Sequence, residues 1–418
     1  MRVLWFTNTP CNYVKYNIGF NGGGWLTSLQ NYIIKHEEFN LGVCFIMNNQ
    51  PYSVVKENVT YYPINSYEKP FKEKVLGYIR YNDITIDKRS WSYYIDKFKK
   101  IIDDFKPDLI HIFGSELYMG LASFASEIPC ILHIQGTLNP IRETLFPPGM
   151  SVHDFIFIDW NPKNIINRYF YVLWWDRNCY REREILKNVK HVIGRTEWDR
   201  RSSYVINPNR VYHFGEEIMR EPFYHPYERI LPQKLTINTV ISAPYYKGYD
   251  LVLKTANCLK TFLNMDFEWN VYGNVCGKYL EKQIGIKHKD VNVRLKGVVT
   301  AEEIREIHSK ATLYYHSSYI ENGCNAIIEA QMCGCTPIAN YVGGLSSTVH
   351  DEETGFLVPA NDIFQSAYLI KYLYENPKEN LKIGQKASNE AFARHNPERI
   401  VEDLFITYNK VINDRKNI

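Results

Sequence analysis

The stretch from Ala311 to Asn340 constrains the fold more than any other part of the sequence. It opens with an apolar run typical of a buried strand. A polar, glycine-containing turn then leads into a helical pattern of about three turns, and a second short apolar run follows. Strand and helix patterns of this kind recur on both sides of the stretch. Such repeated units predict an α/β protein built on parallel sheets, with ligands at the carboxyl ends of the strands.

Two glutamates lie in this stretch, Glu321 in the turn and Glu329 in the helix, which is expected to begin near Gly323. The first N–H groups of a helix have no partner within it and lie at the positive end of its dipole, so the turn favours a phosphate. Glu329 can accept both hydroxyls of a ribose, and Glu321 can meet a sugar beyond the phosphates. The plainer interpretation is a solvated amphipathic helix after a buried strand.

The whole string resembles the signature of the retaining glycosyltransferases of family four, also called glycosyl transferases group 1. The matching residues are Glu321, Glu329, Ala330, Gly334, Thr336 and Pro337. Three residues separate Ala330 from Gly334, where the family has two. The resemblance implies an α/β protein of the GT-B fold, with two Rossmann-like domains that face each other across a deep cleft.

Composition sets further limits. A chain of 418 residues favours two domains over one. A net charge of +3 gives no case for nucleic-acid binding. Nine cysteines, scattered and without CxxC pairs, indicate thiols of a reducing compartment and no zinc site. No uncharged apolar run is long enough to span a bilayer, so we expect a cytoplasmic protein.

The resemblance and the linker-like composition together predict the domain organisation. Residues 1–219 are expected to form an acceptor-binding Rossmann-like domain, and the polar, proline-bearing stretch 220–233 a linker. Residues 234–395 are expected to bind the nucleotide-sugar donor, and residues 396–418 to form a helix that crosses back onto the first domain.

In the first domain, a glycine turn between the first strand and its helix includes Gly23 and Gly24. Such a turn brings backbone N–H groups close to a ligand, although glycine clusters usually mark plain loops. The resemblance places this turn at the cleft. Gln135 stands where many relatives have a histidine that contacts the donor sugar, and its amide can both donate and accept hydrogen bonds.

Arg195 follows a predicted strand, and a basic residue there faces the ligand crevice of an open α/β sheet. The alternative is an ion pair with Glu197 or Asp199. Thr196 is expected to cap the next helix, with Asp199 in its first turn.

In the second domain, Lys247 resembles the lysine of a family Lys-Gly pair that contacts the donor diphosphate. Relatives usually have an arginine five residues earlier, where this chain has Ser242. The resemblance also implies that backbone groups near Gly273 and Val298 hold the base. The predicted phosphate turn consists of Gly323, Cys324 and Asn325.

The resemblance implies a glycosyltransferase, a hexosyltransferase that moves a sugar from a nucleoside diphosphate sugar to an acceptor hydroxyl with retained configuration. We expect a UDP- or GDP-linked donor, no bound metal and no other cofactor. Bacterial surface polysaccharide or glycan synthesis would suit such a chain, with a glycan or lipid-linked glycan as acceptor. Two alternatives stay open: a sugar-nucleotide 2-epimerase of the same fold, and a non-catalytic nucleotide-sugar-binding protein. Ser242 and Gln135 would fit the latter.

Residues 164–188 have a helical pattern rich in aromatic and basic residues. A helix of this composition can lie on an anionic membrane surface, which would place the protein at the inner face of the plasma membrane. An aromatic stripe at helical spacing is more often part of a core.

Overall fold

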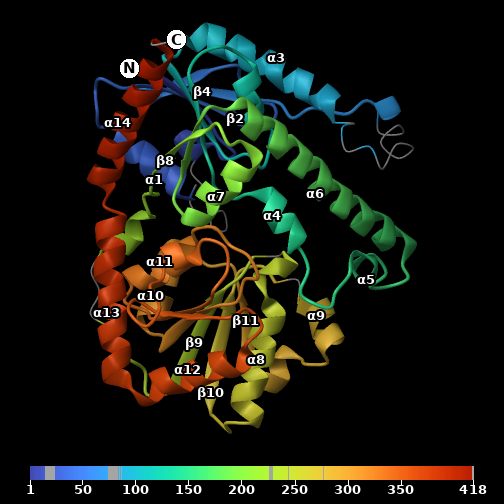
Figure 1. The fold of residues 1–418 in the computed structure, drawn as a ribbon, viewed down its shortest axis with the longest axis vertical. Coiled ribbons are helices and arrows are strands. Elements are labelled where there is room, and N and C mark those ends of the chain that lie inside the picture. Colours follow the sequence, from blue (N-terminus) through green and yellow to red (C-terminus); the bar gives the residue numbers. More distant parts are fainter. Residues whose placement is uncertain are drawn as a thin grey trace.

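The computed structural model describes residues 1–14, 24–73, 83, 85, 87–225, 229–242, 244–275 and 277–416. Two β-sheets flanked by helices form two domains, one above the other in Figure 1. The α/β class and the pair of Rossmann-like domains predicted from the sequence are confirmed.

The sheet of the first domain has eight strands in the described part of the chain, in the order β3-β4-β2-β1-β5-β6-β7-β8. All pairs are parallel except β3 with β4. Its strands are β1 (Arg2–Phe6), β2 (Asn40–Ile46), β3 (Val54–Lys56), β4 (Val59–Ile64), β5 (Leu109–Phe113), β6 (Cys130–His133), β7 (His191–Gly194) and β8 (Val211–Phe214). Its helices are α1 (Gly24–Ile33), α3 (Lys88–Phe105), α4 (Leu138–Glu143), α5 (Val152–Ile156), α6 (Pro162–Asn188) and α7 (Glu197–Ile206).

The sheet of the second domain is parallel throughout its described strands, in the order β11-β10-β9-β12-β13-β14. These strands are β9 (Leu235–Val240), β10 (Phe267–Tyr272), β11 (Val293–Gly297), β12 (Leu313–His316), β13 (Pro337–Asn340) and β14 (Phe356–Val358). The helices around them are α8 (Tyr249–Thr261), α9 (Gly277–Ile284), α10 (Ala301–Ser309), α11 (Asn325–Met332), α12 (Ile363–Glu375) and α13 (Pro377–Arg394). A short 3-10 helix, η5 (Tyr245–Lys247), precedes α8.

The helix of the opening stretch is shorter than predicted. α11 begins at Asn325, and Cys324 before it has extended backbone with φ −95° and ψ 107°. The turn ahead of it is held by other segments: the Glu321 carbonyl accepts from the Gly344 N–H at 2.9 Å. Because these contacts fix the turn in a non-helical shape, the helix covers eight residues and not the expected three turns.

The last helix, α14 (Pro397–Lys416), leaves the second domain and runs along the first, beside α1 (Figure 1). Its apolar residues Ile400, Leu404 and Tyr408 are buried in the same hydrophobic cluster as Trp5 of β1. The Tyr408 hydroxyl also lies 2.6 Å from Nδ1 of buried His111. His111 is therefore a structural residue.

Among the described residues, none of the helices combines the length and apolar character needed to cross a bilayer.

Candidate functional site

Lys247 and Glu321 form the centre of the candidate site. Lys247 ends η5, and Glu321 lies in the turn after β12, so the carboxyl ends of β9 and β12 bring them together. Lys247 Nζ lies 2.5 Å from Glu321 Oε2. Burial lowers the pKa of Lys247, but the charge of Glu321 is the main opposing effect and the net shift is upward. For Glu321, burial raises the pKa, but the charge of Lys247 is the main opposing effect and the net shift is downward. Both groups are therefore charged at neutral pH.

Gly248 allows this close approach. Its φ is +73°, and a Cβ there would lie 2.0 Å from the carbonyl oxygen of Ser317. Only glycine fits both the left-handed backbone and the contact with the end of β12. Replacing it would push Lys247 away from Glu321.

His316 and Cys324 extend this cluster. His316 Nε2 lies 3.5 Å from Glu321 Oε2, and its Nδ1 lies 3.8 Å from the Cys324 sulfur. Burial lowers the pKa of His316, but Cys324 and Glu321 outweigh burial and raise it to about 9. One ligand atom from each of the three lies within 4.8 Å of the others, a spacing that a metal ion could use. The Lys247 ammonium already pairs with the carboxylate, so the group acts here as an ion-pair cluster.

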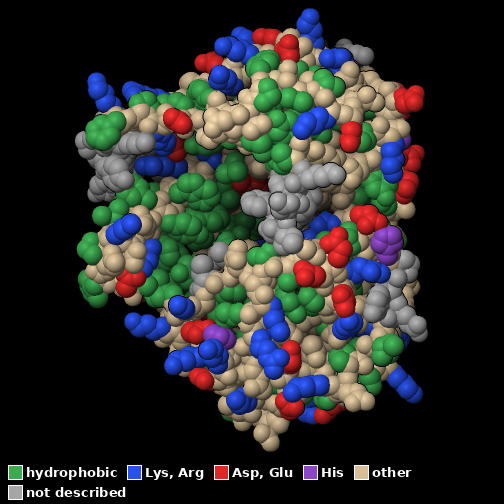
Figure 2. Space-filling view, turned by 180° about the vertical axis from the view of Figure 1, so that it is seen from behind, with side chains coloured by type: hydrophobic (Ala, Val, Ile, Leu, Met, Phe, Trp, Pro, Cys, Tyr) green, Lys and Arg blue, Asp and Glu red, His purple; other side chains and the backbone are tan. Residues whose placement is uncertain are grey.

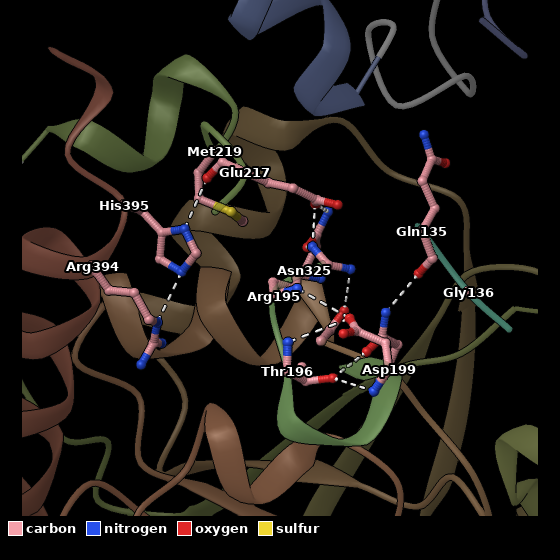
Figure 3. A network of polar contacts seen from close by, with 12 residues as sticks. Gln135, Gly136, Arg195, Thr196, Asp199, Glu217, Met219, Asn325, Arg394 and His395 are labelled. Atoms are coloured by element: carbon pink, nitrogen blue, oxygen red, sulfur yellow. Dashed lines mark hydrogen bonds and ion pairs between the residues drawn. The ribbon is translucent and has the colours of Figure 1, made fainter. Parts of the chain in front are cut away.

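The predicted phosphate turn at the start of α11 is held from the first domain by Arg195 (Figure 3). The guanidinium donates to the Gly323 carbonyl at 2.5 Å and to Asn325 Oδ1 at 3.0 Å. It also forms an ion pair with buried Glu217, whose Oε2 accepts from Asn325 Nδ2 at 2.9 Å. Arg195 thus lies at the turn, and its guanidinium is engaged by protein groups.

The alternative prediction, an ion pair of Arg195 with Glu197 or Asp199, was wrong. Asp199 accepts from the backbone N–H of Arg195 at 3.0 Å and caps α7 together with Thr196, as predicted for the cap. Glu197 pairs with Arg200 instead. The guanidinium reaches past both because Glu217, after β8, offers a buried carboxylate.

Further contacts join the same two edges. Thr196 Oγ1 lies 2.6 Å from Asn322 Oδ1, and Asn322 Nδ2 donates to the Gln135 carbonyl at 3.1 Å. Figure 3 shows the Gln135 side chain pointing away from this network. The carboxyl edges of the two sheets therefore face each other, with the turn 321–325 between them.

Glu329 is buried and paired with Arg220, which sequence reasoning missed. Its Oε1 lies 2.7 Å from Arg220 Nη2 and accepts from Nε at 2.8 Å. Burial raises the pKa of Glu329 and Arg220 opposes it, with the net shift upward. The partner lies 109 residues earlier, in the predicted linker, where no local pattern points to it.

The remaining predicted positions lie at neighbouring strand ends. Gly273 follows β10 with φ +98°, and a Cβ there would lie 2.2 Å from the Ile241 carbonyl oxygen. Val298 follows the adjacent β11 and is 41% exposed. Ser242 is exposed after β9. Gly24 opens α1, whereas Gly23 lies outside the described residues.

Figure 2 shows a deep hollow between the two halves of the molecule, lined largely by hydrophobic side chains. Hydrophobic contacts between the domains lie near α4, α5 and α6. Trp175 of α6 clusters with Tyr246, and Phe155 of α5 packs against Tyr245. The segment 138–175 is therefore a wall that joins the first domain to the turn before Lys247.

Comparison with known proteins shows which family the second domain resembles. Residues 224–390 match the family model described as "Glycosyl transferases group 1". A D-inositol 3-phosphate glycosyltransferase of Paenarthrobacter aurescens (strain TC1) is 28% identical over 152 residues, 35% of this chain and 36% of that protein. An N-acetyl-alpha-D-glucosaminyl L-malate synthase of Bacillus anthracis is 23% identical over 132 residues, 32% of this chain and 35% of that protein. The matched regions thus span about a third of these curated relatives.

Solved structures match over nearly the whole chain. Sucrose-phosphate synthase from Thermosynechococcus elongatus has a TM-score of 0.72 at 14% identity and covers 99% of both chains. HepE from Anabaena in complex with UDP and glucose has a TM-score of 0.65 at 13% identity, over 98% of this chain and 100% of that chain. The whole chain therefore has the GT-B fold, and its segment 224–390 is similar to the glycosyl transferases group 1.

Proposed function

We propose that the chain is a retaining glycosyltransferase that moves a sugar from a nucleoside diphosphate sugar to an acceptor hydroxyl. The observation that carries this proposal is the Lys247–Glu321 pair at the start of the α11 turn, within a segment that matches the family model. The pair lies where the strand ends of the second domain face those of the first. Ligands of parallel α/β sheets bind at such edges.

The chemistry needs stabilisation of the departing diphosphate. The Lys247 ammonium and the N-terminus of α11 supply positive charge there. The bond between the anomeric carbon and the diphosphate oxygen breaks as the acceptor oxygen bonds to the same face of that carbon. The acceptor proton passes to the departing phosphate. Glu321 orients the donor sugar, and its pairing with Lys247 keeps it ionised.

The other half of the donor fits the remaining predicted residues. Glu329 accepts the ribose hydroxyls, with Arg220 holding its carboxylate in place. The backbone near Gly273 and Val298 holds the base. A UDP- or GDP-linked sugar is the proposed donor, used without a metal ion; HepE was solved with UDP-glucose and the trehalose-6-phosphate protein from E. coli with UDP-2-fluoro glucose.

The biological role proposed is synthesis of a bacterial surface polysaccharide or other glycan. The acceptors named for the relatives differ from one another, since one is D-inositol 3-phosphate and another L-malate. Their names therefore do not supply the acceptor of this chain. Peripheral membrane contact near α6 is part of the proposal, because Trp160, Ile166 and Trp174 are 82%, 51% and 45% exposed.

Thermal stabilisation by nucleotides tests the donor site. UDP, GDP, ADP, dTDP and CMP are each added at millimolar concentration, with and without magnesium, to the purified protein. A ligand that binds only the folded state raises its melting temperature by mass action. We expect one diphosphate to do so without magnesium. Stabilisation by none of them would contradict the proposal.

Glu329→Ala tests the ribose assignment. Loss of a buried, charge-assisted hydrogen bond should weaken binding of the stabilising diphosphate by about 1–3 kcal/mol, measured by titration calorimetry. The matched control is Glu353→Ala, which removes an exposed carboxylate of the same domain. Wild-type affinity in a folded Glu329→Ala protein would assign the ribose to another group. Incubation of the wild type with donor alone separates transfer from epimerisation, because an epimerase consumes the donor without an acceptor.

A further inference from the structure

Two polar side chains at the carboxyl edge of the first sheet carry shielded atoms without a hydrogen-bond partner in the described structure. These atoms are Glu116 Oε2 and Gln135 Nε2. β5 and β6 are parallel neighbours, so the segments that follow them lie side by side. Buried polar atoms are nearly always hydrogen-bonded, and an unfilled pair at a ligand-binding edge points to a bound molecule.

The Glu116 carboxylate is held in a defined place. Its Oε1 accepts from the Gly136 N–H at 3.0 Å, and its backbone carbonyl accepts from Arg181 Nη2 at 2.7 Å. Its Oε2 lies over Gly114, where a Cβ would be only 2.1 Å away. Gly114 has a φ of +90°, a conformation that favours glycine, so no side chain at this position competes with Glu116 for the space. The Glu116 carboxylate thus lies beside Gly114 and Gly136, and its Oε2 has no hydrogen-bond partner among the described residues.

The surroundings of Glu116 are acidic. Burial raises its pKa to about 7, and the charges of Glu182 and Glu217 add to the rise. No ion pair reaches this carboxylate from the described residues. An anionic group placed at Oε2 would meet repulsion from this carboxylate, when ionised, and from Glu182 and Glu217. An uncharged hydroxyl, by contrast, can donate a hydrogen bond to Oε2 whether or not the neighbouring carboxyl groups of Glu182 and Glu217 are ionised.

The candidate donor site lies next to these groups. The Gln135 carbonyl accepts from Asn322, one residue after Glu321. Gln135 also precedes Gly136, whose N–H holds Glu116. Burial raises the pKa of the Tyr246 hydroxyl, Lys247 lowers it, and the carboxylates of Glu321 and Glu116 add to the rise, so both carboxylates act on one ring beside Lys247. A molecule on Glu116 and Gln135 would therefore lie beside the turn that holds Glu321, on the side of the first domain.

We propose that Glu116 and Gln135 bind the acceptor, and that the acceptor presents uncharged sugar or polyol hydroxyls at this point. Glu116 Oε2 accepts a hydrogen bond from one acceptor hydroxyl, and Gln135 Nε2 donates to another acceptor oxygen. This inference rests on the glycosyltransferase function proposed above and adds the chemical class of its acceptor. It also moves the Gln135 amide from the donor sugar, which the family resemblance implied, to the acceptor side.

Diphosphate release from the donor sugar tests the proposal. Release is measured alone and with neutral hexoses or their methyl glycosides, and then with the corresponding hexose 6-phosphates. We expect neutral sugars to stimulate release and the phosphates to do so less well. In Glu116→Gln the KM for the neutral sugar should rise about tenfold or more, equivalent to about 1.4 kcal/mol. Its affinity for the diphosphate should stay unchanged.

Two further variants keep the result interpretable. Gln135→Ala removes the unpaired amide and keeps the backbone carbonyl that holds Asn322, so it tests the same subsite without touching a buried carboxyl group. Glu127→Gln, an exposed carboxylate of the same domain, is the matched control and should behave as wild type.

The outcomes separate the two proposals. Diphosphate binding with a wild-type KM in both Glu116→Gln and Gln135→Ala overturns the acceptor site alone. The proposed acceptor class is overturned if hexose 6-phosphates stimulate diphosphate release more than neutral sugars do, or if neither stimulates it. Absence of any diphosphate binding overturns the glycosyltransferase proposal itself.

Discussion

Buried pairs of opposite charge organise the site at the scale of single residues. Lys247 pairs with Glu321 and Arg220 with Glu329. In each pair the two partners are far apart in the sequence. Removing one partner of a buried pair leaves the other charge unpaired and costs about 3–5 kcal/mol, so these residues contribute to stability.

His316 gives this cluster a pH dependence. Its pKa is raised to about 9 in the folded protein, against about 6.5 in an unfolded chain. The folded state therefore binds the proton more tightly, and the resulting stabilisation is complete below about pH 6.5 and lost as the pH rises through 9. His316→Gln should remove this decline, as measured by urea unfolding between pH 6 and 9.5.

The control for His316→Gln is His153→Gln, an exposed histidine on α5. It should keep the decline seen in the wild type. A His316→Gln protein whose free energy of unfolding falls with pH as steeply as that of the wild type would contradict the assignment.

Sequence reasoning found the residues that a local pattern marks. Lys247, Glu321 and Glu329 stand at family positions, and the Thr196 cap follows from its neighbour Asp199. It missed Arg220, Glu217 and Glu116, because each acts through a partner brought close only by the fold. Glu116, for example, is held by Gly136, which follows the adjacent strand.

At the scale of elements, helices and strands form where their hydrophobic patterns predict them if tertiary packing and local propensity favour the same structure. β10 is an example, because apolar residues on both of its faces are buried from Phe267 to Tyr272. α11 departed from its pattern because tertiary contacts of the turn 321–324 overrode local helix propensity. α6 buries residues around much of its circumference, among them Leu173, Trp175 and Cys179. Of its aromatic stripe, Trp175 is buried, Tyr169, Phe170 and Tyr171 are partly exposed, and Trp174 is exposed.

The exposed residues at the start of α6 carry the membrane prediction. Ile166 and Trp174 lie about two turns apart on the helix and keep apolar surface exposed. The double variant Ile166→Ser with Trp174→Ser should sediment less with vesicles containing phosphatidylglycerol, because burial of apolar area drives interfacial binding. The control is Phe364→Ser on α12, which removes an equally exposed apolar residue from the second domain. Equal sedimentation of both variants would argue against contact through α6.

Besides the hydrophobic contacts of the segment 138–175, two connections between the domains lie in the described part of the chain. One is the network around Arg195 and Asn322 at the facing strand ends. The other is α14, which leaves the second domain and completes the core of the first. The relative placement of the domains depends on these side-chain contacts between residues far apart in the sequence, which no local pattern predicts.

Deletion of residues 397–418 tests the second connection. It removes Ile400, Val401, Leu404, Tyr408 and Val411 from the core of the first domain. At about 1.5–3 kcal/mol per buried side chain, this loss is comparable to the whole stability of a typical domain. We expect the first domain of the shortened chain to be cleaved rapidly in limited proteolysis. Tyr408→Phe, which removes only the bond to His111, should cost about 0.5–1.5 kcal/mol and stay resistant.

The position of α14 also governs the order in which this protein can mature on the ribosome. A chain is synthesised from its N-terminus, and domains generally fold as they emerge. Here β1 is made before the second domain, yet Trp5 on it is covered by Tyr408 and its neighbours, which are made after that domain. The first domain therefore waits, with part of its apolar interior uncovered, until the second has been translated.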